Sequence, residues 1–131
     1  MAAAIAEHMP ENLAVLQHMY LAEVVWFARV AGNSDAQIVH YTAPGTIAEL
    51  QAAFREIHAK WLTWAAALED FDVVIPHRNL KGEPFAMPAW QIVLHVTNHG
   101  SFHRGQVAAT LRAAGFAPPA TDLIIWYRLQ K

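Results

Sequence analysis

The segment from Pro10 to Ala31 constrains the fold most, because apolar side chains cover nearly the whole circumference of the helix that it predicts. Positions three and four residues apart, which is the helical period, are occupied by Leu13, Leu16, Tyr20, Val24, Phe27 and Val30. Between them the chain adds Ala14, Val15, Met19, Leu21, Ala22, Val25, Trp26 and Ala28. A helix that is apolar nearly all round needs cover on every side. We therefore expect a second chain to cover part of this helix.

The composition agrees with that expectation. The 131 residues fit a single domain, 1–131. Hydrophobic residues make up 55% of the chain and charged residues 15%, whereas soluble domains usually carry about 25% charged residues. We interpret this shortage of charge as apolar surface buried against another chain, rather than as an unusually large core.

Two further long helices are predicted from their ends. Thr46 and Glu49 have the spacing of a capping box, which predicts a helix over 46–69. Pro88 and Gly115 bracket another helix, because Pro is favourable in the first turn and Gly at the C-terminal cap. The apolar positions expected to pack on this third helix are Trp90, Val93, Leu94, Val107 and Leu111.

The remaining segments are short. Residues 70–87 contain a β-branched run followed by turn residues, which predicts a small hairpin or an irregular crossover. Thr121 can cap a short final helix from Asp122 to about Leu129. The predicted class is therefore all-α: a helical bundle of three long helices, a short C-terminal helix and a small extended insert.

Charge and composition exclude several classes of function. The net charge is −2 and the nine Lys and Arg residues are scattered, so the chain offers no basic patch for nucleic acid. The absence of cysteine excludes disulfides, thiolate metal sites and cysteine nucleophiles. The start of the sequence does not have the pattern of a signal peptide, and no run suits a membrane span. We therefore expect a cytoplasmic protein.

Histidine, the commonest metal ligand, occurs eight times. His95, His99 and His103 follow one another at intervals of four on the predicted third helix, so all three project from one face. This spacing lets neighbouring imidazoles reach one cation. The segment lacks the glutamate of the zinc-protease motif, which disfavours a metalloprotease. The alternative is that these are solvated or hydrogen-bonded helix residues.

A third ligand could come from the first helix. His18 alone suits a buried imidazole bonded to a backbone carbonyl, but with His99 and His103 it completes three nitrogens around open positions, which is typical of a catalytic metal site. Glu23 either orients a ligand imidazole without itself contacting the metal or is an exposed charge. The other histidines are expected to be surface polar residues: His8, His40, His58 and His77.

Longer motifs resemble a known family. They are residues 78–85 (Arg-Asn-Leu-Lys-Gly-Glu-Pro-Phe), Trp90, residues 95–106 (His-Val-Thr-Asn-His-Gly-Ser-Phe-His-Arg-Gly-Gln), Gly115 and residues 118–122 (Pro-Pro-Ala-Thr-Asp). These motifs, together with the first helix and its His18, Glu23 and Trp26, resemble the DinB/YfiT-like family of bacterial metal-binding helical bundles. The resemblance covers nearly the whole chain.

The resemblance implies a four-helix bundle that holds a divalent metal ion, often nickel or zinc, by three histidines. Carried onto this sequence, the ligands are His18, His99 and His103, whereas His95 has no ligand role and lies one turn from the site. Family members have a long first helix before this segment, and only nine residues precede Pro10 here. The resemblance therefore predicts a chain that lacks this helix, and a homodimer or larger oligomer in which a partner covers its place.

Two classes of function follow from the resemblance. Some relatives are thiol-dependent S-transferases or isomerases and others look like hydrolases, which implies a metal-dependent enzyme that uses a low-molecular-weight thiol or water. The candidates for its general base are His95, Glu23 and Asn98. The alternative is a non-catalytic metal-binding or oligomerisation bundle in a stress response.

Overall fold

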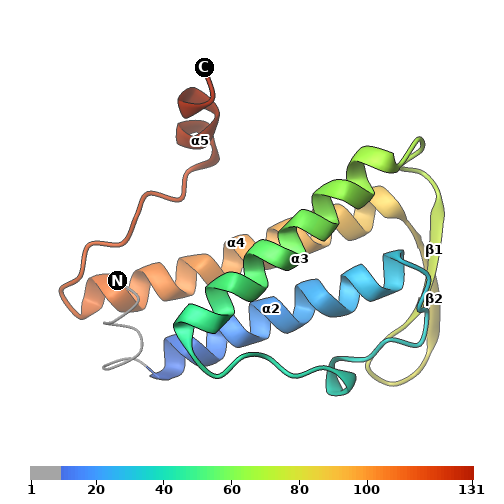
Figure 1. Cartoon of the computed structure of the whole chain (residues 1–131), viewed down its shortest axis with the longest axis horizontal. Helices are drawn as coiled ribbons and strands as arrows, with labels where there is room; N and C mark the ends of the chain where they lie inside the picture. Colours follow the sequence, from blue (N-terminus) through green and yellow to red (C-terminus); the bar gives the residue numbers. More distant parts are fainter. Residues whose placement is uncertain (1–9) are drawn as a thin grey trace.

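The computed structural model describes residues 10–131 and has the predicted all-α architecture (Figure 1). Its elements are α2 (Pro10–Val30), the 3-10 turn η1 (Ile38–His40), α3 (Ile47–Ala67), β1 (Val74–Arg78), β2 (Pro84–Pro88), α4 (Ala89–Ala113) and α5 (Leu123–Leu129). Three long helices, a short C-terminal helix and a small extended insert are thereby confirmed. The prediction of a missing first helix concerns residues 1–9, which lie outside the described residues.

The ends of the long helices follow local signals. The Thr46 side chain accepts a hydrogen bond from the backbone N–H of Glu49 at 3.3 Å, directly before α3 begins. Gly115 follows α4 with a φ of 87°, a conformation that glycine adopts without strain. The predicted cap of α5 was wrong. The N-cap is Asp122 rather than Thr121, because Asp122 itself still has extended backbone angles.

The insert between α3 and α4 is a hairpin. Strands β1 and β2 pair in an antiparallel register that runs from Val74 opposite Pro88 to Arg78 opposite Pro84. Alternate residues of β1 point inward, so that Ile75 is buried under the ends of the long helices. The hairpin therefore closes one end of the bundle (Figure 1).

The long helices are held together through α2, which packs against both α3 and α4. Two apolar clusters lie at different heights along it. The first contains Ile47, Val107 and Leu111, packed against Leu13, Val15 and Leu16. The second contains Val30, Ile75, Ala89 and Ile92, packed against Trp26, Phe27, Trp61, Trp64, Leu68, Met87 and Val96. Between the two clusters, side chains that belong to neither of them make the contact of α2 with α4.

The buried face of α4 differs in part from the prediction. Val107 and Leu111 are buried as expected, but Trp90 and Leu94 are 44% and 60% exposed, and Ile92 is buried instead. Apolar residues occur on more than one side of this helix, so periodicity alone does not select the side that meets α2. Among residues 10–131, no helix combines the length and apolar character needed to cross a lipid bilayer.

Candidate metal centre

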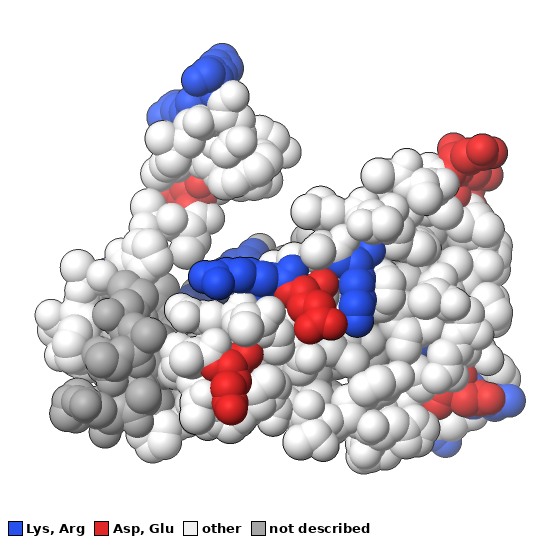
Figure 2. All heavy atoms as spheres, viewed as in Figure 1, with Lys and Arg blue, Asp and Glu red and all other residues white. Residues whose placement is uncertain are grey.

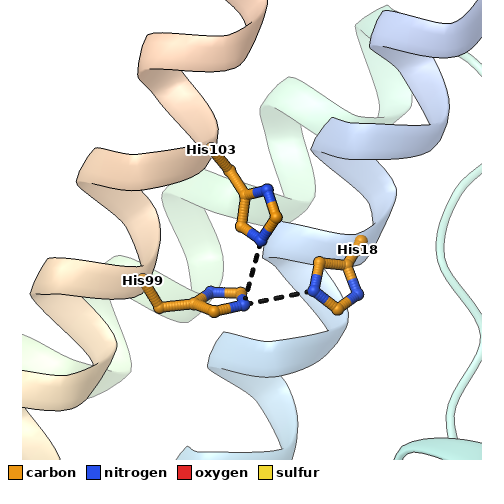
Figure 3. Close-up of side chains that lie close together, drawn as sticks. All are labelled: His18, His99 and His103. Carbon is orange, nitrogen blue, oxygen red and sulfur yellow. Dashed lines mark hydrogen bonds between the residues drawn. The ribbon is translucent and has the colours of Figure 1, made fainter.

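Three histidines from two helices converge on one another (Figure 3). In the sequence of each helix they lie between the residues of the two apolar clusters. His18 projects from α2, and His99 and His103 project from consecutive turns of α4. The Nε2 atom of His99 lies 3.1 Å from Nε2 of His18 and 3.2 Å from Nε2 of His103. One nitrogen of each ring lies within 4.8 Å of the other two. The structure thus brings together the three residues that the sequence singled out.

The spacing of these nitrogens fits a shared cation. Two nitrogens bound to one tetrahedral zinc ion at about 2.05 Å lie about 3.3 Å apart, close to the two observed separations. Packing of α2 against α4 supplies the third nitrogen, and the i, i+4 spacing supplies the other two. His18, His99 and His103 could therefore hold a metal ion. We call them the three-histidine cluster.

The protonation state also suits metal binding. Burial lowers the pKa of His18, and the nearby His103 lowers it further. Burial is again the main cause for His99, whose pKa is lowered as well by His103, His18 and His95. A lowered pKa favours the neutral imidazole, which is the form that binds a metal.

Gln106 fixes the orientation of one ring, a role that the sequence analysis did not assign. Its Oε1 atom lies 2.7 Å from Nδ1 of His103. A proton on Nδ1 satisfies this contact and leaves a lone pair on Nε2, which faces the other histidines. The signals in the sequence are the position of Gln106 three residues after His103, on the same side of the helix, and its place at the end of the 95–106 motif.

A hollow of about 340 Å³ opens beside the cluster. We call it the His hollow; its lining comes from α2, α4 and the hairpin region and includes His18, Trp26, His77, Leu80, His95 and His99. The His95 ring centroid lies 5.8 Å from that of His99 and 5.2 Å from that of Trp26. His95 therefore lies on the wall of the hollow, one turn from the cluster and outside it, as the resemblance implied.

Glu23 neither orients a ligand nor lies exposed. Its side chain is buried, and its Oε2 atom lies 2.8 Å from Nε2 of His58 on α3. This contact with the carboxylate raises the pKa of His58, against a smaller opposing effect of burial. Glu23 thus links α2 to α3, and its charge also acts on His99 of α4, where it opposes the lowering of the pKa.

The other histidines fall into three groups. His40 and His58 are exposed, as predicted. His8 lies outside the described residues. The prediction for His77 was wrong, because β1 turns this ring inward, where its centroid lies 4.9 Å from that of Trp26. Burial is the main cause that lowers the pKa of His77, and Arg29 lowers it further, although a hydrogen-bond contact with the Ile75 carbonyl acts in the opposite direction.

Comparison with known proteins identifies the family of the chain. The sequence model of the DinB family matches residues 2–130. The chain belongs to the DinB family. It is 27% identical over 124 residues to Protein DinB of Bacillus subtilis (strain 168). The aligned region covers 89% of this chain and 72% of that protein. No solved structure matches the chain.

Proposed function

We propose that this DinB-family protein binds one divalent ion, nickel or zinc, through His18, His99 and His103, and uses it in a transferase or hydrolase reaction that involves a low-molecular-weight thiol or water. The observation that carries the proposal is the convergence of three Nε2 atoms at 3.1 and 3.2 Å beside an open hollow. When bound, such an ion supplies Lewis acidity that lowers the pKa of a thiol or a water molecule.

The residues of the chain would prepare this chemistry in two ways. Gln106 holds the His103 ring in the tautomer that presents Nε2. Trp26 and Leu80 line the His hollow and offer apolar surface to the body of a substrate. Because the chain contains no cysteine, a thiol has to come from the solvent as a co-substrate.

His95 is the best placed of the three candidate bases. It lines the His hollow, whereas Glu23 is engaged with His58 and Asn98 lines a different depression on α4, although His95 borders that one as well. An imidazole at this position can accept a proton from a substrate that occupies the hollow. We assign this role to His95 as part of the proposal.

The test begins with metal content. Untagged protein is loaded with nickel or zinc, dialysed and analysed by mass spectrometry, beside the His99→Ala/His103→Ala variant and a His40→Ala control, which removes an exposed histidine elsewhere. We expect about one ion per chain in the wild type and the control, and none in the double variant. Equal metal in all three proteins, or no metal in the wild type, contradicts the proposal.

A second assay separates the two classes of function. The metal-loaded protein is incubated with glutathione or cysteine and a fluorogenic electrophile, and His95→Gln is tested for activity and for metal content. We expect turnover that requires the ion and falls in His95→Gln while its metal content stays unchanged. Metal binding without turnover, with these thiols or in a hydrolase screen, would instead favour the non-catalytic bundle.

A further inference from the structure

The C-terminal helix exposes a large apolar surface. All seven residues of α5 are exposed, with Leu123 at 64%, Trp126 at 54% and Leu129 at 76%. Figure 1 shows α5 standing away from the bundle at the end of an extended linker. Pro118 and Pro119 lie in this linker, and their fixed backbone angles favour an extended chain. We call residues 114–131 the α5 arm.

Among residues 10–131, no helix occupies an apolar groove between α3 and α4. This α3–α4 groove has a volume of about 440 Å³ and is lined by Glu23, His58, Trp61, Leu62, Ala65, Val93, Val96, Thr97 and Arg104. Leu62 on its wall is 73% exposed. Because the long helices are joined through α2, the groove lies where a further helix of a four-helix bundle would pack.

The arm and the groove match in length. Seven helical residues extend about 10 Å, at 1.5 Å for each residue. The α4 side of the groove runs from Val93 to Arg104, which corresponds to about 16 Å of helix. Helix α5 therefore fits within the groove, with room for the two residues that follow it.

The charges match in one orientation. Asp122 lies at the base of α5, and Arg128 and Lys131 lie toward its tip (Figure 2). The groove has Arg104 at one end, and its α3 wall runs through Ala65 toward the acidic residues Glu69 and Asp70, which follow α3 in the chain. An arm that enters beside Arg104 and points toward the end of α3 places opposite charges together at both ends.

The groove wall also carries a polar pair. The Oε2 atom of Glu23 lies 2.8 Å from Nε2 of His58, so this carboxylate already has its partner. Trp126 and Tyr127 each carry a donor at the end of an apolar ring, which suits a groove that is mostly apolar with a few polar groups.

We propose that the α5 arm of one copy docks into the α3–α4 groove of a second copy, and that the exchange is reciprocal. With about 200 Å² for a large side chain, the exposed fractions of the six apolar and aromatic residues of α5 amount to about 700 Å². About half of this surface can face a groove, and a similar area of the groove is covered with it, so two exchanged arms bury about 1,400 Å² in total, within the range of about 1,200–2,000 Å² that specific interfaces bury. A two-fold axis makes both contacts identical. The proposal gives the expected homodimer a defined interface and does not depend on bound metal.

The absence of cysteine allows a direct test. A double variant, Leu62→Cys/Ile124→Cys, places one thiol in the groove and one on the arm of the full-length chain. Under mild oxidation we expect a covalent dimer on a denaturing gel, and the same product when the two single variants are mixed. The control, Val39→Cys/Ile124→Cys, uses an exposed position on η1 outside the groove and should give at least tenfold less covalent dimer.

The wild type and two alanine variants complete the test. Light scattering at several concentrations should show a dimer for the wild type, and Trp126→Ala/Leu129→Ala should raise its dissociation constant at least tenfold. Phe102→Ala, which truncates another exposed ring, should leave it unchanged. A monomeric wild type, a dimer that tolerates the arm substitutions, or a disulfide formed within one chain would each overturn the proposal. Circular dichroism establishes that the variants are folded.

Discussion

The His hollow and the α3–α4 groove both border α4, yet they are lined by different kinds of side chain. The hollow measures about 340 Å³ and lies beside three imidazole nitrogens that converge between α2 and α4. The groove measures about 440 Å³, and its charged and titratable groups sit toward one end of a mostly apolar surface. Convergent nitrogens select a small cation. A long apolar surface has no point on which polar atoms converge, and it suits an elongated segment of protein.

The two sides of the bundle also differ in how their many apolar residues are arranged. On the α2–α4 side, the three-histidine cluster interrupts an otherwise apolar contact. On the α3–α4 side, apolar residues of the described chain remain exposed. The proposed metal binding on the first side depends on the position of individual atoms, whereas the proposed docking on the second depends on area and shape.

The largest difference in stability is expected between two leucines on these two sides. Leu111 is 1% exposed, so Leu111→Ala should lower the free energy of unfolding by about 2–5 kcal/mol. Leu62 is 73% exposed, so Leu62→Ala should change it by less than about 0.5 kcal/mol in protein dilute enough to be monomeric. Urea unfolding with a constant m-value measures both.

The same pair of variants tests whether the groove is filled at higher concentration. We expect the cost of Leu62→Ala to rise once a second copy occupies the groove, and the cost of Leu111→Ala to stay large throughout. Equal costs for the two variants in dilute protein would show that the two sides of α4 do not differ as described.

Gln106→Ala should have the next largest effect, confined to the His hollow. Loss of the contact with His103 should weaken metal binding about 10–100-fold, because the ring loses its fixed tautomer and orientation. Gln91→Ala, on the first turn of the same helix, serves as the matched control. Titration with zinc against a competing chelator gives both affinities. Equal affinities would remove Gln106 from the site.

The smallest effects concern two histidines whose pKa values shift in opposite directions. Burial lowers the pKa of His77, so below about pH 6.5 the unfolded chain takes up protons that the folded chain does not. Stability should therefore fall as the pH falls through this range. The contact with Glu23 raises the pKa of His58. The stability that this contact contributes should therefore be complete below about pH 6.5, and it should be lost as the pH rises through the pKa of His58 in the folded chain.

Two glutamine variants isolate these contributions. His77→Gln should reduce the loss of stability on the acidic side, and His58→Gln should reduce the loss on the alkaline side. Urea unfolding of metal-free protein between pH 5.5 and 8 compares them with the wild type. The same pH slope in both variants would contradict the opposite shifts.

Local and short-range features were predictable from the sequence. Thr46 with Glu49 and the glycine at 115 mark helix ends through contacts within a few residues, so they needed no knowledge of the tertiary fold. The spacing of His99 and His103 fixes their common side of α4 in the same way. His18 was selected by its setting and by the resemblance, and its meeting with the other two depends on how α2 packs against α4.

Features that depend on packing were not predictable. Apolar residues surround much of α4, so the exposure of Trp90 and the burial of Ile92 follow only from the position of α2. The burial of His77 follows from the register of the hairpin against the helices. Gln106 belongs to the 95–106 motif, but its role beside His103 follows only from the contact between the two side chains.

The placement of the cluster between the two apolar clusters has a consequence for local unfolding. We expect each apolar cluster to unfold as a cooperative unit, with the three-histidine cluster between them as the boundary at which one end can open without the other. A cation bound by α2 and α4 at this boundary would couple the two units, because separating the two helices at either end would strain or break its binding site. Amide hydrogen exchange in the two ends of the bundle should then change from independent rates to a single shared rate when zinc is added.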